Sequence, residues 1–229
     1  MFWQEDEDKT LPIAVPDAVL DVSFAIQCKK LPIDHAWALS QAVTGALPWL
    51  ADEPLAGIHT IHVAESGNGW ERPDDPTQHF LLPSRRTPLS LRLPKHRLTD
   101  AQQLAGKTLA IADETVHVGE AKLKTFTPTS TLFARYVLSH TAENEQAFLQ
   151  RMANAILQVA HCKIKKMLCG KTHTLATTQG TLHTRHLMLA DLEQDASIHL
   201  QQYGLGEGRK FGCGLFLPHK SIKTLSSNT

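Results

Sequence analysis

Hydrophobic and polar positions along the first half of the chain predict short strands separated by two helices. Residues 18–30 alternate with the two-residue period of a half-buried strand, whereas residues 36–47 place apolar side chains at helical spacing. Asp34 stands where such a helix is commonly capped. The remaining elements are expected at 57–63, 79–82, 89–93, 100–105, 107–111 and 115–124, the last two as a hairpin or one bent strand. The order is β-α-β-β-α-β, the split βαβ unit of ferredoxin-like folds.

The second half repeats this order after a linker at 126–129. Its strands are expected at 132–140, 162–168, 173–177, 182–189 and 211–217, and its helices at 143–159 and 192–203. The two halves are not similar residue by residue, so only the architecture repeats. The sequence therefore predicts an α+β protein of two tandem ferredoxin-like (β-α-β-β-α-β) domains, 16–126 and 129–229, with a C-terminal glycine-rich loop.

Composition favours a cytoplasmic protein without a cofactor. Hydrophobic residues make up 42% of the 229 residues, which is enough for a substantial core. No apolar run approaches the roughly 18 residues of a membrane span, and the acidic N-terminus is unlike a signal peptide. The cysteines at 28, 162, 169 and 213 form no CxxC pair, and no carboxylate-rich cluster indicates a metal site.

The net charge of zero conceals two halves of opposite sign. Residues 1–120 carry 10 Lys and Arg against 17 Asp and Glu, whereas residues 121–229 carry 13 against 6. No acidic residue occurs between Glu145 and Asp191, a window that contains several histidines and cations. A basic half beside an acidic half favours a polyanion as partner. A charge-segregated dimer or a solvated surface would give the same balance.

Five of the thirteen glycines fall within eleven residues near the C-terminus. The segment contains Gly204, Gly206, Gly208, Arg209, Lys210, Gly212 and Gly214. Successive free amides in such a loop can surround an anion, to which the two cations would add charge. The spacing is neither that of a P-loop nor that of a dinucleotide-binding turn. The segment is thus a phosphate-holding loop or an ordinary tight turn with a solvated Arg-Lys pair.

The glycine-rich segment and two shorter stretches resemble a known family. The shorter stretches are Leu31-Pro32-Ile33-Asp34-His35-Ala36 and Gly57-Ile58-His59. With the repeated ferredoxin-like order, they resemble the RAMP proteins of CRISPR systems. Within these, the chain looks like the endoribonucleases that process precursor guide RNA, the sixth family of Cas proteins, in its Myxococcus-type branch. The resemblance spans nearly the whole chain.

The resemblance implies an enzyme that binds CRISPR repeat RNA, usually at a hairpin, and cuts it at one position without a metal. The 2′-hydroxyl beside the scissile phosphate would be the nucleophile, and the products would carry 5′-hydroxyl and 2′,3′-cyclic phosphate ends. His35 matches the histidine that commonly acts as general base or acid. Its place at a helix start favours a neutral imidazole and a nearby phosphate.

The resemblance does not identify the second proton-transfer group. Some members use a Tyr-His-Lys set, but neither Tyr136 nor Tyr203 matches its tyrosine. His59 and His62 are three apart on an expected strand and point to opposite faces, so only one of them could face the site. We take His59 as the second catalytic candidate, although both residues could be ordinary strand positions.

Further RNA contacts are assigned from charge. The candidates are Lys163, Lys165 and Lys166, on or beside an expected strand, and Arg85 and Arg86, which are expected to reach a hairpin stem. Two of the lysines could share a face and follow a phosphate backbone. A solvated surface would explain each cation singly. Aromatic content of only 6% gives weak support to a base-stacking platform, so recognition of RNA shape and backbone fits better.

The leading hypothesis is a CRISPR-repeat endoribonuclease in which His35 is the general base and the glycine-rich loop contacts RNA. An alternative is a non-catalytic RNA-binding subunit of the same superfamily, which would hold guide RNA in an effector complex with other Cas proteins. A third, weaker hypothesis is a small-ligand-binding protein of nucleotide metabolism. Neither a DNA partner nor a membrane is expected.

Overall fold

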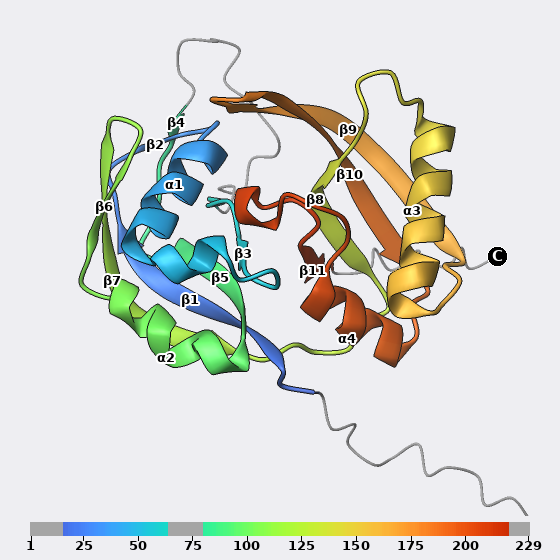
Figure 1. Cartoon of the computed structure of the whole chain (residues 1–229), viewed down its shortest axis with the longest axis horizontal. Coiled ribbons are helices and arrows are strands. Elements are labelled where there is room, and N and C mark those ends of the chain that lie inside the picture. The colour runs from blue at the N-terminus through green and yellow to red at the C-terminus, as the bar shows by residue number, and fades with distance from the viewer. Residues whose placement is uncertain (1–15, 64–79, 220–229) are drawn as a thin grey trace, which may run out of the picture.

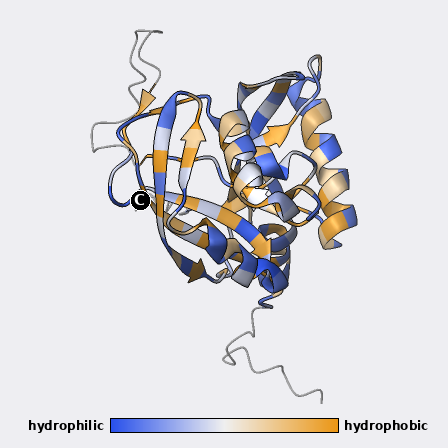
Figure 2. Ribbon diagram, turned by 60° about the vertical axis from the view of Figure 1, so that its left-hand side comes forward, coloured by the Kyte–Doolittle hydropathy of each residue, from blue (hydrophilic) through white to orange (hydrophobic). Residues whose placement is uncertain are grey.

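The structure is a computed structural model that describes residues 16–63 and 80–219. Over these ranges the chain forms two large sheets, each with helices packed on one face, and a small sheet of two short strands, residues 31–32 and 80–81 (Figure 1). Hydrophilic and hydrophobic residues alternate along the strands, as expected where one face of a sheet is covered (Figure 2). The loop expected at 66–76 lies outside the described residues.

The first sheet has five strands in the order β3-β5-β1-β7-β6. The elements are β1 (Val19–Gln27), β2 (Leu31–Pro32), α1 (Ala36–Ala46), β3 (Gly57–Ile58), β4 (Phe80–Leu81), β5 (Pro88–Pro94), α2 (Leu98–Ala101), β6 (Thr108–Ile111) and β7 (Glu114–Lys124). Leu39 and Val43 on α1 pack against Val22 and Phe24 of β1 in one core. Without β6, the order is that of a split βαβ unit, so the predicted first domain has the expected topology.

Three local expectations for this half were wrong. The strand at 57–63 is limited to Gly57–Ile58, so His59 and the residues after it lie outside it. The second helix begins at Leu98 rather than near residue 100. Asp34 does not cap α1; its Oδ2 accepts a hydrogen bond of 3.1 Å from the amide of Ala176 in the second half. His35 occupies the N-cap position instead.

The second sheet has four strands in the order β11-β8-β10-β9. The elements are β8 (Leu132–Leu138), α3 (Glu145–Ala160), β9 (Lys166–Thr177), β10 (Gly180–Ala190), α4 (Gln194–Tyr203) and β11 (Phe216–Pro218). The Asn144 side chain caps α3, and Phe148, Met152 and Ile156 form its buried stripe. This is again a split βαβ unit, which confirms the tandem fold. The limits 16–126 and 129–229 stay a prediction, and residues 220–229 lie outside the described part.

Two expected strands of this half were wrong in extent. A single strand, β9, replaces those at 162–168 and 173–177. Gly170 does not interrupt the strand; it lies within it, against the Cβ of His186. The last strand begins at Phe216 rather than at residue 211. The reason is that Arg209–Phe211 forms a 3-10 turn and the two glycines that follow have positive φ, which an extended strand does not allow.

A buried ion pair joins the two halves. Arg92 of β5 is fully buried and donates to both carboxylate oxygens of Asp21 on β1, at 2.8 and 3.0 Å. Its third bond, of 3.0 Å, goes to the carbonyl of Phe216 on β11. The guanidinium also lies over the ring of Phe126 at 4.8 Å. The first sheet is therefore fixed to the edge of the second by one arginine.

Candidate functional site

His35 is held by the backbone on both sides of its ring. The residue is 2% exposed, and Nδ1 lies 2.7 Å from the carbonyl of Pro32 and 3.1 Å from that of Ile33. Nε2 accepts a 2.9 Å hydrogen bond from the amide of Ile61, so Nδ1 carries the proton. Burial lowers the pKa of His35 below its ordinary value. A neutral imidazole was expected here, but in a first turn open to a phosphate; the structure engages both nitrogens instead.

His59 lies against the buried ion pair. Its Nε2 is 3.5 Å from Oδ1 of Asp21, and the side chain is 12% exposed. Burial lowers the pKa of His59, and the carboxylate of Asp21 opposes that shift. Because β3 ends at Ile58, the expectation that His59 and His62 point to opposite faces of a strand does not apply. His62 is exposed and hydrogen-bonded to Oγ1 of Thr60 at 2.8 Å.

The glycine-rich loop folds back on itself between α4 and β11. All five of its glycines have positive φ. Gly204 ends α4, and a Cβ on Gly214 would lie 1.9 Å from the carbonyl oxygen of Leu205. Leu205 donates to Gly214 at 3.0 Å, and Gly214 donates to Tyr136 on β8 at 2.7 Å. Only glycine permits so close an approach of the two arms of the loop.

The two cations of the loop point to carbonyl groups rather than to open solvent. Arg209 donates to the carbonyls of Tyr203, Gln202 and, at 2.9 Å, Leu55 of the first half. Lys210 donates to the carbonyl of Ala51, also in the first half. The pKa of Arg209 is lowered to about 10, chiefly by burial. The expectation that Arg209 contacts RNA is therefore not supported by its geometry, since its guanidinium joins the loop to both halves.

The loop also packs against α1. The rings of Trp37 and Phe211 stack at a centroid distance of 5.3 Å. A Cβ on Gly212 would lie 3.0 Å from the methyl group of Thr60. Figure 1 shows the loop, in red, between α1 and the second sheet. Its exposed tip is Gly206-Glu207.

The other predicted cations lie apart from His35. Lys163 and Lys165 precede β9 in an exposed loop, and Lys166, its first residue, pairs with Asp191 at 2.9 Å. The opposite end of β9 approaches α1, where the amide of Ala176 bonds to Asp34. Ten residues of strand span about 33 Å, so the lysines stand far from the start of α1. As expected, the three lysines lie on or beside a strand: Lys166 begins β9, and the other two lie just before it.

Arg85 and Arg86 are exposed in the turn between β4 and β5. The amide of Arg86 donates to Oγ of Ser84 at 3.2 Å, and Thr87 closes the turn by accepting from the Ser84 amide at 3.0 Å. Neither guanidinium takes part in an ion pair or hydrogen bond with another described residue. Both remain predicted RNA contacts.

A group of side chains that the sequence did not single out lies on the face of the second sheet turned away from α3. The rings of His173 on β9 and His186 on β10 stack at 4.5 Å, and Tyr136 on β8 lies edge-on to His173 at 5.8 Å. Arg135 and Lys171 act electrostatically on His186. We call these five residues the histidine face. Phe133 and His219 extend its row of rings toward β11.

Two β-bulges, one on each side of His186, bring the side chains of the histidine face together. The register of β10 against β8 shifts at His186, which faces both Arg135 and Tyr136. The register against β9 shifts at the same residue, so His186 also faces Gly170 and Lys171. A Cβ on Gly170 would lie 2.8 Å from that of His186, so glycine allows this close approach. Bulges re-aim side chains and are frequent beside active sites.

A family model described as Cas6 Crispr matches residues 20–221 of the chain. The chain belongs to the Cas6 family. The CRISPR-associated endonuclease Cas6 of Myxococcus xanthus is 28% identical over 199 residues, which cover 87% of this chain and 81% of the relative.

Solved Cas6 structures share the fold. The product of a Cas6-related gene from Pyrococcus furiosus has a TM-score of 0.61 at 11% identity, covering 87% of this chain and 98% of that one. A second structure, a CRISPR associated protein Cas6, has a TM-score of 0.61 at 11% identity, with coverage of 88% and 100%. The tandem ferredoxin-like architecture predicted from the sequence is thus the Cas6 architecture.

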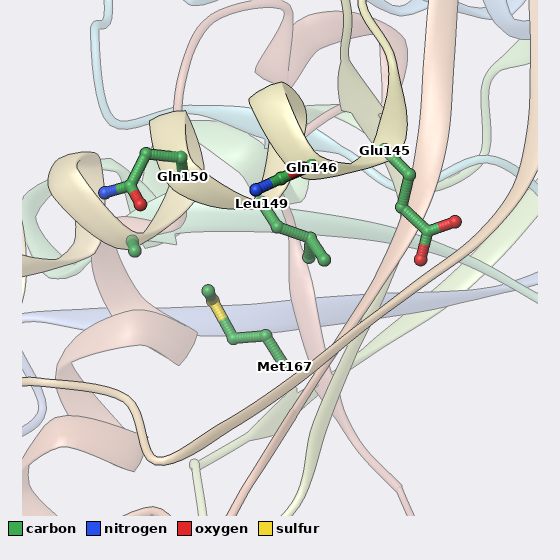
Figure 3. A pocket seen from close by; sticks show the side chains of 6 residues that line it. Glu145, Gln146, Leu149, Gln150 and Met167 are labelled. Carbon is green, nitrogen blue, oxygen red and sulfur yellow. The ribbon is translucent and has the colours of Figure 1, made fainter.

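Among residues 16–63 and 80–219 of this Cas6 chain, no three His, Cys, Asp or Glu side chains gather as metal ligands. The helices of these ranges also lack the length and hydrophobicity of a membrane span. A pocket between α3 and β9 is lined by Glu145, Gln146, Leu149, Gln150, Ala153 and Met167. Leu149 and Met167 point toward each other across it (Figure 3). It lies on the helix side of the sheet and contributes nothing to the histidine face.

Proposed function

We propose that this Cas6 chain binds CRISPR repeat RNA and cuts it into guide RNAs by attack of a 2′-hydroxyl, without a metal ion. The observation that carries the proposal is the gathering of histidines and cations between the two domains of a chain that belongs to this family. The Myxococcus xanthus relative is named an endonuclease, and a similar structure is described as a RAMP protein that binds different RNA substrates (TM-score 0.57, 13% identity). The repeat RNA, in hairpin form, would be the main partner, and other Cas proteins could join it.

The reaction needs a base, an acid and positive charge. A base takes the proton of the 2′-hydroxyl, an acid protonates the leaving 5′-oxygen, and cations stabilise the negative charge that develops on the oxygens of the phosphorane-like transition state. Imidazoles serve both proton roles near neutral pH. The products are a 5′-hydroxyl and a 2′,3′-cyclic phosphate, so no water is consumed in the cut.

His35 and His59 remain the catalytic candidates predicted from the sequence. Either ring would first have to give up a protein partner. Nε2 of His35 would exchange the Ile61 amide for the substrate hydroxyl, and His59 would leave Asp21. The remaining proposed RNA contacts are the loop tip at Gly206, its neighbour Gly208, and the two exposed arginines at 85 and 86.

The experiment is a cleavage assay with the chain's cognate CRISPR repeat, run with EDTA and with magnesium. We expect the same rate in both, a single cut, and 2′,3′-cyclic phosphate ends. A repeat with a 2′-deoxynucleotide before the cut should bind but stay intact. Cleavage that stops in EDTA and returns with magnesium would refute the metal-independent chemistry. Binding without any cleavage would favour the non-catalytic RNA-binding subunit.

A further inference from the structure

A second pocket lies on the second sheet, on the face opposite to the one that meets α1. Leu175 of β9 and Leu182 of β10 are paired and pack with Ala36 at the start of α1. Their neighbours along the two strands point the other way, because successive side chains of a strand alternate between its faces. The pocket has a volume of about 390 Å³ and is lined by residues of this opposite face and of the connection between β8 and α3. The sheet therefore separates it from His35.

Hydroxyl groups and imidazoles line the pocket, together with one guanidinium. Thr172 of β9 is paired with Arg185 of β10, and Thr174 is paired with His183, so the four side chains share one face. The connection contributes residues 139–141, and its first amide donates to the carbonyl of His183 at 2.9 Å. The two threonine hydroxyls and the ring of His183 form no hydrogen bond with another described residue. Each of these groups is thus free to donate a hydrogen bond to a ligand.

Arg185 brings a positive charge that is not paired with a carboxylate of any described residue. Its Nη2 donates to the backbone carbonyl of Glu143 at 2.8 Å, and its Nη1 lies 3.9 Å from Sγ of Cys169. The carboxylate of Glu143 is bound instead by Arg151, at 2.6 and 2.7 Å. Asp and Glu are absent from the described residues that line the pocket. The lining therefore combines donors with a cation and lacks the carboxylates that would repel an anion.

We propose that this pocket binds a phosphate group, at a site separate from the one at which RNA is cut. The hydroxyls of Thr172 and Thr174 and the N–H of the His183 ring donate to its oxygens, while Arg185 supplies the charge. The volume lies in the range of small-ligand pockets. A phosphate of the RNA backbone and one of a small phosphorylated ligand share this chemistry. The proposal does not depend on cleavage, because a chain that leaves RNA uncut would still bind phosphate here.

NMR spectra of the full chain test the proposal, with inorganic phosphate replacing chloride at constant ionic strength. We expect the amide signals of residues 139–141, 172–174 and 183–185 to shift together along one saturable curve. Signals in these segments that do not move, or that shift linearly without saturation, would overturn the proposal. The measurement uses the unchanged chain, so a variant that fails to fold cannot obscure the result.

Variants of the exposed threonines show which groups hold the phosphate. Thr172→Val combined with Thr174→Val removes two hydroxyl groups and keeps the β-branched shape that suits a strand. We expect it to weaken phosphate binding by at least about 10-fold, since each group bonds to a charged ligand. The matched control is Thr181→Val, an exposed position on the same face of β10 but outside the pocket. Equal affinity of the double variant and the control would contradict the assignment.

The uncleavable 2′-deoxy repeat distinguishes the two sources of the phosphate when it is added to the phosphate-saturated chain. If the pocket binds the RNA backbone, the repeat displaces phosphate, and the double threonine variant binds the repeat more weakly but cuts bound RNA at the unchanged rate. If the pocket binds a small phosphorylated ligand, both bind at once and the affinity for the repeat is unchanged. A double variant that no longer cuts bound RNA would overturn the separation of the two sites. Failure of the unchanged chain to cut would instead refute the proposed function and leave phosphate binding intact.

Discussion

The two sheets of the chain share a strand order, yet the faces turned away from their helices are used in opposite ways. On the first sheet, Asp21 and Arg92 form a buried ion pair, and Ser23 bonds to Ser90 at 2.8 Å, so the polar groups satisfy one another. On the second sheet, the equivalent face carries stacked imidazoles among cations that are half exposed. The polar groups of the first sheet are thus used up in joining the domains, whereas the second sheet packs on α1 through Leu175 and keeps its half-exposed cations available for RNA.

Breaking the ion pair should have the largest effect on stability. Asp21→Asn removes the charge that compensates Arg92, and an uncompensated buried cation costs about 3–5 kcal/mol. Urea denaturation measures this cost. Asp17→Asn is the control, because Asp17 pairs with Lys95 on the exposed surface, where loss of a pair has no measurable effect. Equal stability of the two variants would contradict the structural role assigned to the ion pair between Asp21 and Arg92.

The stability cost of a Gly→Ala substitution in the glycine-rich loop should depend on the space around that glycine. Gly214→Ala places a Cβ against the Leu205 carbonyl at a positive φ, and we expect it to cost about 2–4 kcal/mol. Gly206→Ala has the same strain but open space around it, so it should cost about 1–2 kcal/mol. Thermal or urea unfolding compares the two. If both cost the same, the loop is not the close-packed connection described here.

His35→Gln should both destabilise the fold and slow cleavage. It removes the bond to the Ile61 amide inside the protein, which costs about 1–3 kcal/mol. The loss of a proton-transfer group should slow the cutting of bound RNA by about 10²- to 10⁴-fold. The exposed His117, in the first sheet, provides the control as His117→Gln. Cutting of bound RNA at the full rate would remove His35 from the catalytic candidates.

The effect of His35→Gln on the free energy of unfolding should depend on pH. The pKa of His35 lies below its ordinary value of about 6.5, so the unfolded chain binds a proton that the native ring does not. The stability from the neutral ring is fully present above about pH 6.5 and is lost as the pH falls. The difference in unfolding free energy between the unchanged chain and His35→Gln should therefore shrink toward about pH 5. A difference that stays constant would contradict the buried neutral ring.

The smallest effect is expected from the lysines of β9 and of the loop before it. Lys171→Gln should reduce the slope of log affinity against log salt by about 0.7, the value for one phosphate contact on single-stranded RNA. Lys163→Gln combined with Lys165→Gln should leave the slope unchanged, because these residues lie at the far end of the strand. A larger change of this slope for the double variant would indicate that the RNA contacts that end of β9 instead.

The fold could be predicted from the sequence because it depends on periodic burial. Leu39 and Val43, or Phe148 and Met152, repeat at the spacing of one helix face, and the strand alternation is equally local. The last strand was extended too far toward the N-terminus because Phe211 looks like a strand residue until the positive φ of the next glycine is known. The hydrophobic pattern does not show which glycines have positive φ, so it does not show where the loop ends and the strand begins.

The site was less predictable because it depends on register. His173, His186 and Lys171 lie in the window without acidic residues, so their charge was visible in the sequence. Their grouping depends on two bulges at His186, each of which shifts the strand pairing by one residue. The hydrophobic pattern of the sequence does not reveal these shifts. The family resemblance directed attention to His35, whose ring is fully engaged by backbone groups. Arg209 likewise looked free because its contacts depend on the fold of the loop, which returns the guanidinium to the end of α4 and to the carbonyl of Leu55 in the first half.

The most direct measurement is an experimental structure of the chain with the 2′-deoxy repeat bound. It would locate the scissile phosphate relative to the catalytic candidates His35 and His59. The account predicts this phosphate near the start of α1, with Nε2 of His35 turned from the Ile61 amide to the substrate. A phosphate far from both histidines, with the bond between His35 and the Ile61 amide intact, would contradict it.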